Sequence, residues 1–367
     1  VIVVETVKPE AGKLQVSYTG NMNLSMPDLS SYNLMNSREK LEFERLAGRY
    51  DPTTWSTTNE VELTRLYNEK LKGIESGVNT YWLAEPLRVG VNQKHSLYVQ
   101  GGEGNFLFGL GAGYNGISGV MEKSERDVVS GNIDLIYRMS KFQFSNKFSL
   151  TSTHFKNPIV AFSAYAAANP YYKKYNDEGT VDKWLEYNDY FKASNPLWNA
   201  SQNSRDKGSN LLSNYFMAEY FPTTEWRVRA RLGLTYGNDD TEKFYSRNDT
   251  RYENVETTKK GEFHSNNVRT NQVEAELSVT YAKVLGKHRI NLVAGGNISS
   301  NKSLTQGYSA VGFPDGDFSY PSFSNGYPEY GTPAYYESVS RSVNGYFNAG
   351  YSFDDRYLMD FSLRTSG

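Results

Sequence analysis

The stretch Trp226-Arg227-Val228-Arg229-Ala230-Arg231-Leu232-Gly233-Leu234-Thr235-Tyr236 decides the fold class. Its apolar side chains fall on every second residue and therefore share one face of a β-strand, while three arginines share the other face. Three arginines in a row cannot lie in a dry core without partners, although they can line a watery lumen. Aromatic residues close the apolar face at both ends, as in strands that cross a membrane. The stretch therefore predicts a transmembrane strand of an antiparallel β-barrel.

The same alternation recurs along the chain and predicts about eleven strands. Many of them are about ten residues long, which is the length that a tilted strand needs to cross a bilayer. Strands of soluble proteins are usually nearer five or six residues. The predicted strands lie near residues 14–20, 95–101, 104–114, 131–139, 142–152, 211–221, 226–236, 270–283, 287–298, 342–352 and 356–364.

The connections between these strands alternate strictly between short and long. Short turns are expected at 102–103, 140–141, 222–225, 284–286 and 353–355. The links between them are longer, at 21–94, 115–130, 153–210, 237–269 and 299–341. Outer-membrane barrels have short periplasmic turns and long extracellular loops, and a soluble sandwich has no reason to keep all its long loops at one end.

The long links contain structure of their own. Residues 37–48 and 59–73 predict helices, with Ser37 and Asn59 as their N-caps and Gly73 after the end of the second helix. The segment Gly312 to Tyr336 is rich in Gly, Pro, Tyr and Phe, and it predicts an ordered aromatic loop.

Composition fits the same architecture. The 367 residues hold 39 Lys and Arg against 41 Asp and Glu, so the net charge of −2 gives no reason to expect a nucleic-acid partner. Cysteine is absent, which excludes disulfides and thiolate chemistry. Aromatic residues make up 14%, too many for a disordered chain. No run of about eighteen apolar residues is present.

Several stretches, in their order and spacing, resemble the SusC/RagA-type TonB-dependent transporters of Bacteroidetes. Asn-Pro followed by an aromatic residue is common in loops, so the order of the stretches carries the resemblance. They are Val1 to Thr6 with Lys13 to Gly20, Tyr32 to Asn36, Asn79 to Trp82 with His95 to Gly102, Ala168 to Tyr172 with Tyr175-Asn176, Asn195 to Asn199, and Arg341 to Val343 with Asp355 to Leu358 and Ser362 to Arg364.

The resemblance implies a nutrient importer in the outer membrane of a Gram-negative bacterium. It implies TonB-dependent uptake of oligosaccharides or peptides, a SusD/RagB-like surface lipoprotein acting as a lid, and energy from the TonB-ExbB-ExbD complex through segments outside this chain. Barrels of this class have about 22 strands around a plug. Residues 1–12 would then end the plug and its linker, and residues 13–367 would form the N-terminal half of the barrel, embedded in outer-membrane lipid.

Three alternatives stay open on the sequence. A passive porin or a surface-binding barrel would lack the plug and the TonB-contact segment. A secreted soluble β-protein would pack one face of every strand against a second sheet. An outer-membrane enzyme would need a catalytic signature, and the four histidines and the paired acids form none. We therefore expect no catalytic residue, no cofactor and no metal site.

Arg227, Arg229 and Arg231 form a charge ladder on the predicted lumen face. The ladder could contact an anionic or polar substrate. Alternatively, it pairs with acids on a neighbouring strand or on the plug, and we favour pairing because buried charges are normally paired.

Aromatic residues in the long links are the candidates for substrate contact, since sugar rings stack on aromatic faces. Packing of the loops against one another, or docking of the lid, is the alternative interpretation, and we favour it. The candidates are Tyr171, Tyr172, Trp198, Phe313, Tyr320 and Tyr327.

Overall fold

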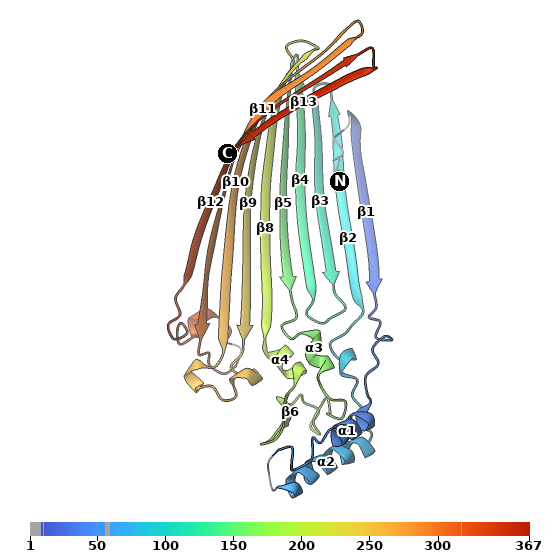
Figure 1. The fold of residues 1–367 in the computed structure, drawn as a ribbon, viewed down its shortest axis with the longest axis vertical. Helices are drawn as coiled ribbons and strands as arrows, with labels where there is room; N and C mark the ends of the chain where they lie inside the picture. Colours follow the sequence, from blue (N-terminus) through green and yellow to red (C-terminus); the bar gives the residue numbers. More distant parts are fainter. Residues whose placement is uncertain (1–8, 10, 56–58, 317) are drawn as a thin grey trace.

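The computed structural model describes residue 9 and residues 11–55, 59–316 and 318–367. Its main feature is one antiparallel sheet of eleven strands, in which every strand pairs with the next along the chain (Figure 1). The strands are β1 (Gly12–Ser25), β2 (Gly90–Glu103), β3 (Phe106–Ser118), β4 (Glu125–Met139), β5 (Phe142–Lys156), β8 (Ser204–Tyr220), β9 (Trp226–Tyr245), β10 (Glu262–Leu285), β11 (His288–Val311), β12 (Ala334–Phe353) and β13 (Tyr357–Ser366). All eleven predicted strands are confirmed.

Most strands extend further than predicted at the end that carries the long links. For example, β9 continues nine residues past Tyr236, and β10 begins at Glu262 rather than near residue 270. At about 3.3 Å per residue and a tilt of about 40°, nine residues raise the sheet by roughly 20 Å beyond the apolar band. Alternation of apolar and polar residues fades there because both faces are polar, so no two-residue period marks these extensions.

The ends of the hairpins need small corrections. The β2–β3 turn lies at 104–105 rather than 102–103, with Gly104 at φ +59°. The predicted turn at 140–141 is confirmed, and the other short turns lie at 221–225, 286–287 and 354–356. The prediction of a long link at 115–130 is wrong. Because β3 and β4 pair as far as Ser118 and Glu125, only residues 119–124 connect them.

Five external loops, named L1 to L5, therefore connect the strands at one end of the sheet (Figure 1). Their bounds are L1 26–89, L2 119–124, L3 157–203, L4 246–261 and L5 312–333. L5 contains most of the predicted aromatic loop, whose last residues belong to β12.

L1 contains the two predicted helices, α1 (Ser37–Leu46) and α2 (Glu60–Glu75). The cap of α1 is Asn36 and not Ser37, because the Asn36 side chain accepts a hydrogen bond from Glu39 N at 3.0 Å while the Glu39 carboxylate accepts one from Asn36 N at 2.9 Å. Asn59 caps α2 as predicted. Gly73 does not follow the end of α2 but lies in its last turn, and Gly77 follows the helix with φ +92°.

Further short elements had no sequence prediction. L3 contains α3 (Phe162–Ala166), the hairpin strands β6 (Trp184–Tyr187) and β7 (Lys192–Ser194), and α4 (Pro196–Gln202). Single turns of 3₁₀ helix lie at Trp82–Ala84 in L1, Thr250–Tyr252 and Thr257–Lys259 in L4, and Pro321–Phe323 in L5. None of the helices in the described ranges is long and apolar enough to cross a membrane.

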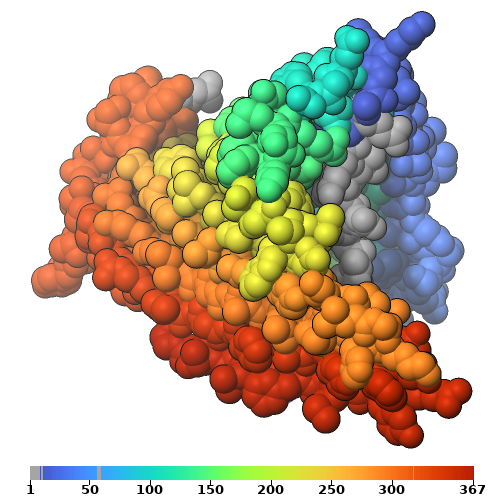
Figure 2. Space-filling view, turned by 90° about the horizontal axis from the view of Figure 1, so that it is seen from above, coloured from blue at the N-terminus to red at the C-terminus, as the bar shows by residue number. Residues whose placement is uncertain are grey.

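The two faces of the large sheet differ sharply. Register pairs the apolar residues of neighbouring strands on one face, and these side chains remain open, with Leu277 57% and Val343 62% exposed. In the described part of the chain the only other sheet is the β6–β7 pair, so no second sheet covers this face. Seen end-on, the hairpins follow one another around an arc (Figure 2). The arrangement excludes the soluble sandwich and fits a barrel wall facing lipid.

Candidate functional site

The polar face of the sheet carries its charges near the short turns. Strand register places Arg229 opposite Glu219 of β8, and Arg231 opposite Glu276 of β10. Arg229 and Glu219 form an ion pair at 2.9 Å, and Arg231 forms an ion pair with Glu276. The Tyr346 hydroxyl donates to the other oxygen of Glu276 at 2.9 Å. The favoured interpretation of the ladder, pairing with acids on the neighbouring strands, is therefore confirmed for these two arginines.

Arg227 differs from the other two members of the ladder. It lies opposite Thr280 of β10 and forms no ion pair with any residue that the structure describes. Its guanidinium is the one member of the ladder still available to a partner or substrate.

The charged residues near the short turns, which we name the charge belt, continue from β8, β9 and β10 onto β4 and β5. Lys147 lies 3.6 Å from Asp134, and Arg138 donates to Gln143, which donates to Glu219 at 3.1 Å. Residues of β4, β5, β8 and β9, among them Arg231, line a hollow of about 450 Å³. Pro9 lies in the same hollow, and a side chain at Gly109 would come within 3.2 Å of it. Pro9 therefore lies against the polar face.

Beyond the belt, toward the external loops, the polar face holds mainly hydroxyl and amide side chains. Ser299 and Ser342 hydrogen bond across β11 and β12 at 2.8 Å, and Thr235 and Ser213 do so across β8 and β9 at 3.4 Å. These groups can exchange hydrogen bonds with a passing polar molecule. Nearer the external loops, basic side chains including Arg126 and Lys207 lie on the same face.

Replacing Glu219 by Ala should destabilise the barrel wall. The Glu219 side chain is only 7% exposed, so the change leaves the Arg229 guanidinium half-buried without its acid. We expect a loss of about 2 kcal/mol in the free energy of unfolding, below the range for fully buried pairs because Arg229 keeps some water. Urea unfolding in detergent measures it. The double change Glu219→Ala with Arg229→Ala should recover part of the loss, and a loss equal to the sum of the two single changes would contradict coupling.

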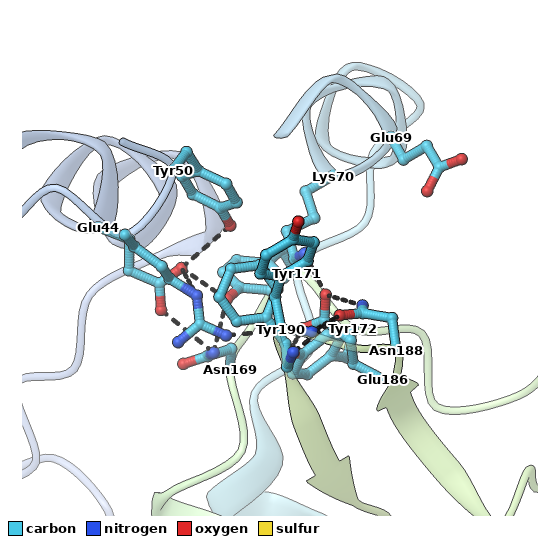
Figure 3. Close-up of polar contacts among 12 residues, drawn as sticks. Glu44, Tyr50, Glu69, Lys70, Asn169, Tyr171, Tyr172, Glu186, Asn188 and Tyr190 are labelled. Atoms are coloured by element: carbon cyan, nitrogen blue, oxygen red, sulfur yellow. Dashed lines mark hydrogen bonds and ion pairs between the residues drawn. The ribbon is translucent and has the colours of Figure 1, made fainter. Parts of the chain in front are cut away.

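Two buried carboxylates join L1 to L3 (Figure 3). Glu44 of α1 accepts a hydrogen bond from the Tyr171 hydroxyl at 2.7 Å. Glu186 of β6 accepts one from the Tyr172 hydroxyl and forms an ion pair with Lys70 of α2 at 2.5 Å. Lys70 points from α2 into this cluster, whereas Glu69, one residue earlier, points away (Figure 3).

Arg49 bridges the two carboxylates. Its guanidinium lies 3.5 Å from Glu44 and 3.6 Å from Glu186, and it stacks on the Phe191 ring at 4.0 Å. Burial alone would lower the pKa of Arg49, but Glu44 together with Tyr171, Tyr172 and Tyr50 outweighs burial and raises that pKa. Two acids are thus balanced by two bases inside the loops, and we name Glu44, Arg49, Lys70 and Glu186 the loop charge cluster.

Tyr171 and Tyr172 remain neutral donors in this cluster. Burial raises the pKa of both phenols far above the ordinary value, and neighbouring groups including Glu44 for Tyr171 and Glu186 for Tyr172 raise it further. Neutral hydroxyls donate to carboxylates, so the protonation states and the geometry agree. Trp82, which is 2% exposed, donates from its indole to Asn169 O at 2.9 Å and closes the same core.

L3, L4 and L5 are interlocked in turn. Trp198 of α4 donates to Asn248 O of L4 at 2.9 Å, and Asn199 donates to Thr250 at 2.8 Å. Phe313 of L5 donates from its backbone to Lys260 O at 2.8 Å and packs edge-on against the Phe244 ring. L1, L3, L4 and L5 therefore form one connected rim at the external end of the sheet.

The six candidate aromatic residues occupy different places on this rim. Tyr171, Tyr172 and Phe313 are buried, with exposures of 4%, 7% and 2%, and Trp198 is half-buried. Tyr320 and Tyr327 of L5 are exposed, at 69% and 53%. The structure brings Tyr171 and Tyr172 together and leaves the others apart. Contact of any of the six with substrate stays a prediction, and only Tyr320 and Tyr327 present open ring faces.

Sequence reasoning missed the loop charge cluster. A signal was present in α1, because Glu44 lies three residues after Leu41 and therefore on the same, inward face. No comparable signal exists for Glu186, whose burial depends on a four-residue strand inside L3. Among the described residues no group of three or more His, Asp or Glu side chains could hold a metal ion.

Fold and polar wall together define the class: the sheet is part of an antiparallel transmembrane β-barrel. No protein-family model matches the sequence, and no curated protein sequence matches it. Among solved structures, a chain of the RagAB peptide transporter matches with a TM-score of 0.80 at 15% identity, over 98% of this chain and 43% of that one. The RagAB peptide importer in its "open-open" state matches with a TM-score of 0.79 at 15% identity, over 98% of this chain and 42% of that one.

The resemblance to SusC/RagA-type transporters is thereby confirmed at the level of the fold. This chain spans less than half the length of the RagAB chains that it matches.

Proposed function

We propose that this chain forms the N-terminal half of a TonB-dependent importer barrel in the outer membrane. The observation that carries the proposal is the charge-paired polar wall behind an open apolar face, in a fold similar to the RagAB peptide transporter over nearly the whole chain. The wall would line the lumen, the apolar face would meet lipid, and L1 to L5 would lie outside the cell. Residues 1–12 would end the plug and its linker, of which Pro9, Ala11 and Gly12 belong to the described residues, and residues 13–367 would belong to the barrel.

Uptake of an oligosaccharide or a peptide is the transport activity that we infer. Neutral hydroxyl and amide groups of the upper wall suit either substrate, because both exchange hydrogen bonds with such surfaces. A lipoprotein lid of the SusD/RagB type would sit over the rim formed by L1, L3, L4 and L5, and the TonB-ExbB-ExbD complex would supply energy through other segments of the protein. A passive porin is the second candidate, but Pro9 lying against the polar wall favours a lumen that holds a plug.

The deciding experiment is purification of the full-length protein from outer membranes in mild detergent, followed by mass spectrometry of what accompanies it. We expect a SusD-like lipoprotein together with bound oligosaccharide or peptide, and the ligand then names the substrate class. Purification of the protein without a lipoprotein and without a bound ligand would favour a passive porin. Solubility without detergent would overturn the barrel itself.

Removing the exposed aromatic rings of L5 should weaken substrate capture. For the double change Tyr320→Ala with Tyr327→Ala we expect about tenfold weaker binding of the co-purified ligand, since a stacked ring contributes about 0.5–1.5 kcal/mol beyond its buried area. Isothermal titration of the detergent-solubilised protein measures this. Tyr335→Ala is the control, because Tyr335 is 65% exposed on the outward face of β12. Equal weakening in the control would argue against the L5 rings.

A further inference from the structure

The apolar outward face ends at a definite level on each strand, and basic residues gather just beyond that level on β10, β11 and β12. The uninterrupted apolar stretch of the outward face ends at Val273, Ile298 and Val343, and only isolated apolar residues such as Val339 and Leu304 lie further out. The next two outward positions are Asn271 and Arg269 on β10, Ser300 and Lys302 on β11, and Arg341 and Val339 on β12. These three strands lie side by side toward the C-terminal edge of the sheet (Figure 1).

Register makes Arg269, Lys302 and Arg341 one patch. Lys302 pairs with Asn271 on one side and with Val339 on the other, so each arginine lies two residues along from a direct partner of Lys302. Diagonal neighbours in an antiparallel pair are about 7–8 Å apart, within reach of long side chains. We name these three residues the basic patch.

Two of the three residues of the basic patch carry charges that are not paired with an acid. Arg269 and Arg341 are exposed and form no ion pair or side-chain hydrogen bond with any residue that the structure describes. Lys302 forms an ion pair with Glu337 at 2.9 Å, while its side chain remains 48% exposed. A second acid, Asp240 of β9, lies two residues along from Asn238, the direct partner of Arg269. Two acids against three bases still leave a net positive surface at the edge of the apolar band.

The same level on the other strands has a different character. Beyond Tyr114, Val129 and Leu150, the next outward residues of β3, β4 and β5 are Gly116, Asp127 and Ser152. On β8 and β9 they are Asn210 and Asn238. Basic side chains at the boundary are therefore concentrated on β10 to β12, so the patch is not a general feature of the barrel rim.

We propose that Arg269, Lys302 and Arg341 bind the phosphate groups of an anionic lipid of the outer leaflet. The inference rests on the proposed function, because it needs the apolar band to lie in the outer membrane with the loops outside. The patch then lies at headgroup depth, where the acyl chains would cover Ile298 and Val343 and the phosphates would meet the guanidinium groups. Arginine suits phosphate because its planar fork can donate two hydrogen bonds.

The test is binding of fluorescent diphosphoryl lipid A to the full-length protein in dodecyl maltoside micelles. A basic side chain near an anionic lipid surface contributes roughly a fivefold gain, so R269Q with R341Q should weaken binding about thirtyfold. The control is R356Q with K287Q, which removes the same charge from two short turns at the opposite end of the sheet and should leave binding within about threefold of the wild type.

The possible results of this experiment distinguish a failure of the lipid-site proposal from a failure of the importer proposal. If the heat-modifiable barrel forms and both double variants bind lipid A as the wild type does, the lipid site is overturned while the importer proposal stands. If 10 mM inorganic phosphate displaces the lipid completely, the patch is a free-phosphate site and the lipid assignment fails. If the wild-type protein is soluble without detergent, the proposed function fails first.

Discussion

Replacing Leu277 by Arg should prevent the barrel from assembling stably. Leu277 lies in the middle of the apolar outward stretch of β10, between Val279 and Ala275, and its side chain is 57% exposed on the uncovered face. A charged side chain placed toward lipid at the bilayer midplane costs about 2–4 kcal/mol. That is a large part of the stability of an ordinary domain, so we expect a strong fall in the fraction of folded protein.

The measurement is heat modifiability on a gel, in which a folded barrel migrates differently from an unfolded one. Asn297→Arg is the matched control. Asn297 pairs with Glu276, next to Leu277, but its side chain lies on the polar face beside that carboxylate. The control should fold as the wild type does. Equal damage from both changes would mean that the two faces are not lipid and lumen.

The strands could be predicted because, in a strand that crosses a membrane, apolar and polar side chains alternate with a two-residue period. Trp226 to Tyr236 showed it most clearly, since three arginines and five apolar side chains separate without exception. The period also predicted which residues share a face, and hence that the charge ladder lies on the polar face. It could not show how far strands continue beyond the membrane, because in residues 237–245 polar side chains occur on both faces.

Loop structure was only partly predictable. The helices of L1 have local signals in their caps and their apolar faces, and both were found, although the cap of α1 was placed one residue late. The packing of Tyr171 against Glu44 joins residues 127 positions apart, and no local pattern encodes such a contact. The candidate aromatic residues were chosen by type, which cannot distinguish the buried Phe313 from the exposed Tyr320.

Replacing Glu44 by Ala should release L1 from L3 while the barrel stays folded. The Glu44 side chain is 7% exposed, and its carboxylate meets Tyr171 at 2.7 Å and both Arg49 and Lys40 at 3.5 Å. Removing the acid should cost about 2–3 kcal/mol, below the range for fully buried pairs because the Arg49 side chain is 30% exposed and keeps some water. The loss should act locally, because Glu44 contacts the loops and lies far along the chain from the strands of the charge belt.

Limited proteolysis of the detergent-solubilised protein measures this opening. We expect cleavage within residues 26–89 to accelerate by at least about thirtyfold, in line with the free-energy change when opening is fast relative to cleavage. Heat modifiability should be unchanged. Glu42→Ala is the control on the same helix, because Glu42 is 48% exposed and its pair with Arg45 is a solvent-screened surface contact that adds little to stability.

Glu44→Gln separates charge from hydrogen bonding in the same site. An amide can still accept from the Tyr171 hydroxyl, but it cannot balance the charge of Arg49. If charge balance holds the loops together, Gln should behave almost as Ala does. Protection close to the wild type in the Gln variant would instead assign the junction to the tyrosine hydrogen bond. A barrel that unfolds together with L1 in either variant would show that the rim and the wall unfold as one cooperative unit, and would contradict the prediction that L1 is released alone.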